Sequence, residues 1–149
     1  MIVYALLLAQ AAAAQPACPA TPAPLPADLA GWRESGADLS SGKAVTLATV
    51  DPKVALLKDV PPPARPGNMV VASFRVTAAG SYGVALDQRG WIDLYAAGGS
   101  TPLKSAKHGH GPVCSGIRKI VRFDLVPGEY RVVIGELEGA SAKLMLVRG

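Results

Sequence analysis

Two histidines lie two residues apart in the stretch KHGHGPVCSGIRK, which runs from Lys107 to Lys119. On an extended strand, side chains at positions i and i+2 point to the same side, so His108 and His110 can present their imidazoles together. Imidazole is a ligand for zinc, copper and iron. The spacing therefore indicates a candidate metal site, which needs at least a third ligand to be stable.

Further ligands for such a metal would have to come from other parts of the chain. The candidates are Asp93, Asp87, Tyr95 and, with a reduced thiol, Cys114. None of them has a diagnostic spacing from the histidines, and Asp93 is the one we assign to the site. The glycines on either side of His110 oppose a rigid ligand strand, because glycine raises the entropic cost of keeping side chains still. A glycine-containing turn with locally hydrogen-bonded imidazoles is the simpler interpretation.

The same stretch contains the residue types of nucleophilic catalysis. Ser115 with a histidine and Asp93 has the composition of a catalytic triad, and a free Cys114 beside His110 would be a second nucleophile. The serine does not lie in a Gly-x-Ser-x-Gly elbow, and the cysteine alternative requires that no disulfide forms. We therefore expect a protein that is not an enzyme.

Basic side chains surround the histidines. Lys107, Arg118 and Lys119 lie in this stretch, no acidic residue occurs from Leu94 to Phe123, and the whole chain has a net charge of +4. A positive patch favours an anionic ligand, although a solvated basic face is the simpler alternative. Nucleic acid is not an expected partner, because no aromatic residues alternate with the basic ones in this patch.

Two aromatic residues precede the histidine stretch. Trp91 and Tyr95 share one face of a predicted strand, where they could stack on a sugar ring. Residues of this kind also fill a core or cover the edge of a sheet. Both interpretations stay open, and we include the pair among the candidate ligand-binding residues.

The chain has two cysteines, Cys18 and Cys114. In an oxidising compartment a single pair of this kind forms a disulfide, which here would close a loop of about a hundred residues and contribute roughly 4 kcal/mol in the chain-entropy model. A lipid anchor on Cys18 is the alternative. The lipobox of such anchors has an aliphatic residue where this chain has Gln15.

The N-terminus predicts export. An apolar run over residues 2–8 and the small residues 12–14 indicate a signal peptide that is cleaved near Ala14, giving a periplasmic or secreted protein. The residues before the apolar run include no lysine or arginine, although signal peptides usually carry such a charge there. This would fit a translation start further upstream. No later segment has 18 consecutive apolar residues, so no membrane span is expected. Residues 15–42 are rich in proline and alanine, which predicts a stiff arm with little secondary structure.

Alternation of apolar and polar residues begins near residue 43 and indicates eight or nine short strands. We expect strands over 43–50, 53–57, 69–80, 81–87, 91–96, 103–106, 119–137 and 142–147. Within 119–137, Pro127 and Gly128 predict the turn of a hairpin. Each strand has one apolar face to bury, which predicts an all-β domain over 43–149 with an antiparallel, jelly-roll-like β-sandwich fold.

Two segments resemble the β-sandwich modules of the pre-peptidase C-terminal type, which are attached to secreted bacterial enzymes. They are FRVTAAGSYGVALDQRGWIDLYAAG and RFDLVPGEYRVVI. The matching positions are Phe74, Gly80, Tyr82, Asp93, Tyr95, Phe123, Pro127, Gly128 and Tyr130. This resemblance covers roughly residues 70 to 135 and implies a fold rather than a function.

The whole chain is also similar to a family of short exported alphaproteobacterial proteins. These proteins share an alanine-rich signal, a PACPA arm, the triplet WID and the motif HGHGPxCSxIRKIV. Some members are labelled homogentisate dioxygenase, an activity that uses iron bound by two histidines and a carboxylate in a longer, intracellular cupin protein. A cupin motif continues from His-x-His to a glutamate, whereas this chain continues to Cys114 and has no later histidine.

The expected function is therefore that of an exported accessory domain. It would bind an anionic ligand or an envelope protein through the region from Lys107 to Lys119 and the adjoining sheet. No cofactor is expected in that case. One alternative is a metalloprotein with a copper, zinc or iron ion on His108 and His110, including the metal-dependent dioxygenase. A further alternative is a structural envelope protein without a ligand.

Overall fold

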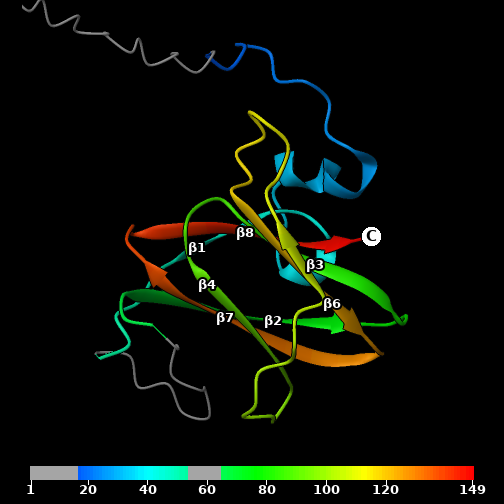
Figure 1. Ribbon diagram of the computed structural model, residues 1–149, viewed down its shortest axis with the longest axis vertical. Helices are drawn as coiled ribbons and strands as arrows, with labels where there is room; N and C mark the ends of the chain where they lie inside the picture. Colours follow the sequence, from blue (N-terminus) through cyan, green and yellow to red (C-terminus); the bar gives the residue numbers. More distant parts are fainter. Residues whose placement is uncertain (1–16, 54–64) are drawn as a thin grey trace, which may run out of the picture.

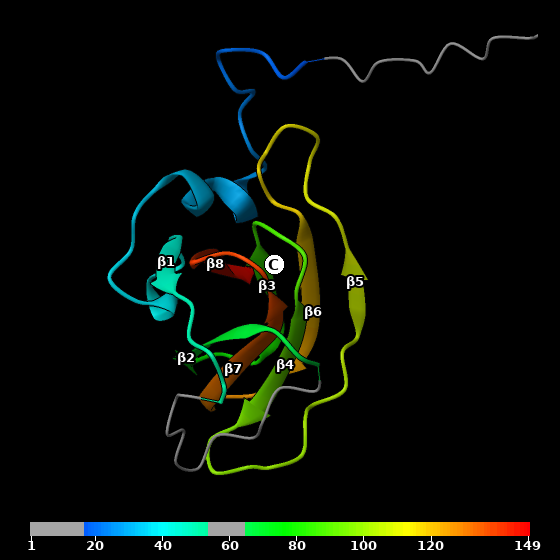
Figure 2. The same ribbon diagram turned by 90° about the vertical axis from the view of Figure 1, so that its left-hand side faces the viewer.

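Two antiparallel sheets packed face to face form the protein in the computed structural model, which describes residues 17–53 and 65–149 (Figures 1 and 2). One sheet has five strands in the order β1-β8-β3-β6-β5, and the other has three in the order β2-β7-β4. This arrangement confirms the predicted all-β antiparallel sandwich. The predicted signal peptide and nearly all of the strand expected over 53–57 lie outside the described residues.

The strands follow the predicted alternation closely. Their bounds are β1 Val45–Ala48, β2 Asn68–Val76, β3 Gly80–Leu86, β4 Trp91–Ala96, β5 Lys107–Gly109, β6 Lys119–Leu125, β7 Gly128–Leu137 and β8 Ser141–Arg148. The strand expected over 103–106 is absent there, and β5 begins at Lys107 instead. Figure 2 shows the chain leaving β4, passing along the molecule and rising to β5 at the outer edge of the larger sheet.

The main core lies between the two sheets. Val70, Phe74 and Val76 of β2 are 2–3% exposed, and Ala72 packs against the same core, while Ser73 and Arg75 face outward, as the period of two predicts. Inward side chains of both sheets form one apolar cluster with them. Burial of this surface is the main stabilising term, because each large apolar side chain contributes roughly 1.5–3 kcal/mol when removed from water.

Consecutive strands mostly belong to different sheets, which corrects one prediction. The segment 119–137 was expected to be a hairpin with a turn at Pro127 and Gly128. Instead, β6 pairs with β3 and β5, while β7 pairs with β2 and β4. The hairpin prediction was therefore wrong. Alternation indicates which face of a strand is buried, but it fits a hairpin and a crossing between sheets equally well.

Two tyrosines fix crossings between the sheets. The Tyr82 hydroxyl donates to the carbonyl of Ala78 at 2.7 Å, and the Tyr130 hydroxyl donates to the carbonyl of Val126 at 2.7 Å. Tyr130 also accepts a hydrogen bond from the backbone N–H of Val126 at 3.3 Å. Both rings are buried, so each tyrosine ties the crossing segment that precedes its strand to the core.

The N-terminal segment has more structure than the proline-rich composition predicted. Residues 15–42 were expected to form an arm with little secondary structure, but two 3₁₀ helices occur there, η1 Ala27–Arg33 and η2 Leu39–Ser41. Leu29 and Trp32 of η1 are buried in a second cluster on the outer face of the five-stranded sheet, and Leu39 is buried in the main core. Short 3₁₀ helices bury single side chains, so their sequences show little periodicity.

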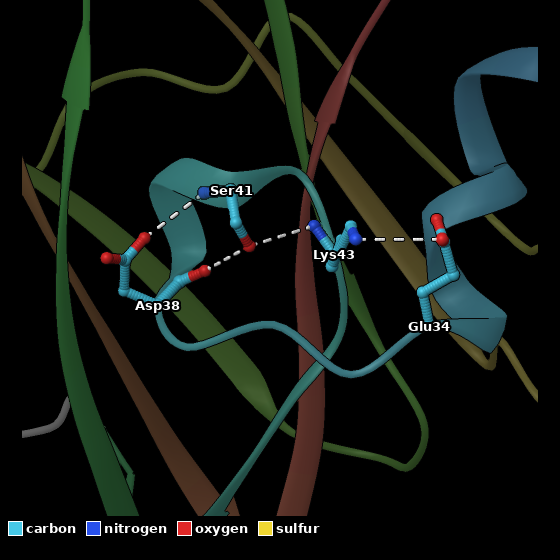
Figure 3. Close-up of polar contacts among 4 residues, drawn as sticks. All are labelled: Glu34, Asp38, Ser41 and Lys43. Atoms are coloured by element: carbon cyan, nitrogen blue, oxygen red, sulfur yellow. Dashed lines mark hydrogen bonds and ion pairs between the residues drawn. The ribbon is translucent and has the colours of Figure 1, made fainter.

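A network of polar contacts holds η2 and the residues on either side of it (Figure 3). The Asp38 carboxylate accepts from the Ser41 N–H at 3.1 Å, the Ser41 hydroxyl donates to the Asp38 carbonyl at 2.6 Å, and Lys43 lies 3.6 Å from Glu34. The Asp38 carboxylate therefore caps the N-terminal end of η2.

The predicted disulfide is present between Cys18 and Cys114, whose Cα atoms are 5.5 Å apart. It attaches the start of the described chain to the loop that follows the histidines. The bond occupies the thiol that a lipid anchor on Cys18 would require. Within residues 17–53 and 65–149, no helix is long and apolar enough to cross a membrane.

We predict that the double variant Cys18→Ala/Cys114→Ala unfolds at lower denaturant concentration than the wild type. The expected loss is about 2–4 kcal/mol in the free energy of unfolding, because the disulfide restricts the unfolded chain. Equilibrium unfolding in urea would measure it. The reduced wild-type protein is the matched control and should behave like the variant, and an unchanged midpoint in both would contradict the prediction.

Candidate functional site

A cleft of about 290 Å³ is lined by residues of both sheets. It gathers five of the residues that the sequence identified as candidates for a site: Trp91, His108, His110, Arg118 and Lys119. Trp91 begins β4 of the three-stranded sheet, whereas His108 and Lys119 lie on β5 and β6 of the five-stranded sheet. The site therefore depends on the packing of the two sheets against each other.

Three other predicted site residues, Asp93, Tyr95 and Lys107, do not line this cleft. Tyr95 is 4% exposed and packs with Met69 and Val133, so it cannot stack on a ligand. Burial raises the pKa of the Tyr95 hydroxyl, and nearby Asp93 raises it further. Lys107 lines a smaller, neighbouring cleft of about 210 Å³ that also includes the two histidines.

The residues proposed as metal ligands do not come together. Among residues 17–53 and 65–149, no group of three or more histidine, cysteine, aspartate or glutamate side chains could hold a metal ion. Asp93 instead accepts a hydrogen bond from the indole N–H of Trp91 at 3.2 Å. The disulfide excludes Cys114 as a thiolate ligand.

The loop after the histidines is closed by its own hydrogen bonds. The Ser115 hydroxyl donates to the carbonyl of Pro112 at 2.6 Å and accepts from the N–H of Ile117 at 3.1 Å. His110 Nδ1 lies 3.0 Å from the carbonyl of Arg118. A carbonyl only accepts, so this contact places a proton on Nδ1 and leaves Nε2 for other partners. Ser115 therefore stabilises a turn and is not joined to a histidine in a triad.

Trp91 organises the cations of the cleft. The Arg65 guanidinium carbon lies 4.5 Å from the centroid of the indole ring, and the Lys119 ammonium lies 5.7 Å from it. Lys119 also donates to the carbonyl of Gly90 at 2.9 Å. Cation–π contacts of this kind are favourable and fix the direction of long basic side chains. The indole thus contacts cations of the protein, which differs from the sugar platform considered from the sequence.

Lys119 has an unusual electrostatic environment. Burial lowers the pKa of its ammonium group below the ordinary value, the Glu136 carboxylate opposes that shift, and Arg65 adds to it. The charged form of Lys119 is thus poorly compensated in the free protein. A negatively charged group that entered the cleft would compensate it.

Three residues of the cleft were missed in the sequence: Arg65, Arg89 and Glu136. Arg65 follows a proline-rich segment, and Arg89 lies in the turn between β3 and β4, so neither belongs to a recognisable motif. Glu136 appears in sequence as a simple continuation of β7. The tertiary structure alone reveals that these charges share a cleft with the predicted residues.

No family model matches this chain, and no curated protein matches it. The similarity to the pre-peptidase C-terminal modules and to the exported alphaproteobacterial family therefore stays an expectation.

We predict that the Lys119 ammonium titrates below its ordinary pKa of 10.5 in the free protein. Because the folded pKa is lowered, the charged group opposes folding at pH values below both pKa values, and stability rises as the pH increases through that interval. An NMR titration of the Lys119 side chain would measure the midpoint. Saturation with phosphate should move the midpoint upward, and a free-protein midpoint at or above 10.5 would disprove the prediction.

We also predict that Gly90→Ala destabilises the protein by about 1–3 kcal/mol, as overpacking of a core does. A Cβ at this position would lie 2.9 Å from a methyl of Leu86 and 3.0 Å from one of Leu137, and both side chains are buried. Urea unfolding would measure the effect. Gly109→Ala is the matched control, because a Cβ there has no neighbour within 4 Å. Equal stabilities of the two variants would show that Gly90 is not sterically required.

Proposed function

We propose that this protein is an exported, non-catalytic domain that binds an anionic group in the cleft around Trp91. The observation that carries this proposal is the charge of the lining. Four basic side chains, Arg65, Arg89, Arg118 and Lys119, share one cleft of about 290 Å³ with a single carboxylate. Clustered charges of one sign raise the local concentration of the opposite ion and strengthen its binding.

The cations are oriented before any ligand arrives. The indole of Trp91 and the carbonyl of Gly90 direct Arg65 and Lys119 into a common region. A ligand that meets oriented side chains loses less of its binding free energy to the ordering of the protein. This geometry supports binding more directly than a flexible basic surface would.

The same charges oppose the alternative of a metal on His108 and His110. Arg118 and Lys119 line the cleft with both imidazoles, and like charges repel a divalent cation there. The dioxygenase alternative requires a carboxylate ligand. Asp93 is engaged by Trp91, and Glu136, the carboxylate of the cleft, forms no three-ligand group with the histidines in the described part of the chain. We therefore place the anion ahead of the metal.

Export is part of the proposal. The disulfide between Cys18 and Cys114 is typical of proteins that mature in an oxidising compartment. Together with the predicted signal peptide, it supports a periplasmic or secreted location. An anion from the envelope or the surroundings would be the natural ligand there.

We predict that ethyl phosphate binds the cleft and that Lys119→Gln or Arg65→Gln weakens its binding by about tenfold, because each removes a charge-assisted hydrogen bond. Calorimetry would measure the affinities, and NMR shifts would locate the ligand. Binding should also weaken as salt increases, since salt screens partly exposed charges.

Lys104→Gln is the matched control for these variants. Lys104 belongs to the same acid-free segment, is exposed and does not line the cleft. Its replacement should change the affinity less than twofold, an estimate based on the small effect of isolated surface charges. Equal losses in Lys104→Gln and Lys119→Gln would indicate a diffuse basic surface, and no binding at all would favour the structural alternative.

A further inference from the structure

Glu136 has an unusual backbone conformation. Its φ angle is 60°, in the left-handed region that residues other than glycine seldom occupy. The pairing of β2 with β7 explains why: Asn68 pairs with Leu137 and Val70 with Ile134, so two residues of β7 oppose the single Met69. This arrangement is a β-bulge, a feature that redirects side chains next to functional sites.

The bulge decides where Glu136 points. Tyr130, Val132 and Ile134 face the core, so uninterrupted alternation would place residue 136 there as well. With the extra residue, Leu137 enters the core in its place and is 2% exposed, while Glu136 lines the cleft. A strained backbone therefore delivers a carboxylate to a site that is otherwise positive.

Gly67, the residue before β2, packs against the bulge. A Cβ on Gly67 would lie 3.0 Å from the Cα of Glu136, and the φ angle of Gly67 is 123°. A side chain at position 67 would therefore meet the backbone of the bulge. Two positive-φ residues, Glu136 in β7 and Gly67 just before β2, thus meet where this carboxylate is placed.

The carboxylate is kept apart from the cations of the cleft. Within the described part of the chain, the ion pairs are Lys43–Glu34, Arg75–Glu129 and Arg122–Asp28, and none of them includes Glu136. No described cation lies within 4.0 Å of it, although four line the same cleft. The cleft therefore has a negative position and a positive region that do not neutralise each other by direct contact.

We propose that the ligand is a small zwitterion, with its anionic group on the cations around Trp91 and its ammonium on Glu136. This inference rests on the proposed function and deepens it. A simple anion would be repelled by Glu136, whereas an ammonium on the same ligand turns that repulsion into attraction. A cleft of about 290 Å³ lies at the lower end of the range for small-molecule sites, which favours a compact ligand.

The test compares ethyl phosphate with 2-aminoethyl phosphate, which differs only by the ammonium group. We expect the wild-type protein to bind 2-aminoethyl phosphate about tenfold more tightly, as a charge-assisted contact predicts. Glu136→Gln should abolish this preference by weakening 2-aminoethyl phosphate and tightening ethyl phosphate. Calorimetry on the full mature chain would measure all four affinities.

Glu138→Gln is the matched control, because Glu138 is exposed, lies two residues further on and does not line the cleft. It should preserve the preference. The comparison of the two ligands on wild-type protein needs no variant, so a folding defect in Glu136→Gln would not remove the test. Equal wild-type affinities would overturn the zwitterion but leave the anion cleft, whereas no binding of either compound would overturn both.

Discussion

The structure depends on one constraint: the inward apolar faces of the two sheets, which form the main core, can be buried only against each other, while smaller apolar clusters lie on the outer faces. Strands that follow one another in the chain therefore pass repeatedly from sheet to sheet. Tyr82 and Tyr130 stabilise two of these passages, because each combines a buried ring with a hydroxyl that bonds the backbone of the crossing segment. The crossings in turn determine which strand ends become neighbours.

The cleft is a consequence of those crossings. Its residues come from β4, β5, β6 and β7 and from the segments that precede β2, β4 and β6, which are distant in the chain and belong to different sheets. Cations placed close together repel, so their arrangement needs compensation. The ring of Trp91 partly compensates the charges of Arg65 and Lys119 through cation–π contacts, and the Gly90 carbonyl further compensates Lys119 by accepting its hydrogen bond. The remaining positive potential is available to a ligand.

The stretch from Lys107 to Lys119 is held in place by several contacts of its own. Its turn is closed by Ser115, its end is attached to Cys18 by the disulfide, and Gly111 packs so closely on Ile117 that a Cβ would lie 2.4 Å from that side chain. These contacts position His110 and Arg118 at the cleft. Both histidines thus line the cleft, and no third metal ligand joins them within the described residues.

The sequence by itself determined most of the described strands, the inward face of β2 and the disulfide, because alternation is local and a single pair of cysteines has one partner each. Five residues of the cleft were also identifiable from their types and spacing. Only the tertiary structure decided that β6 and β7 separate into different sheets, that Leu29 and Trp32 cover the outer face of one sheet, and that Glu136 enters the cleft. Each of these depends on a partner strand distant in sequence, and local periodicity carries no information about that partner.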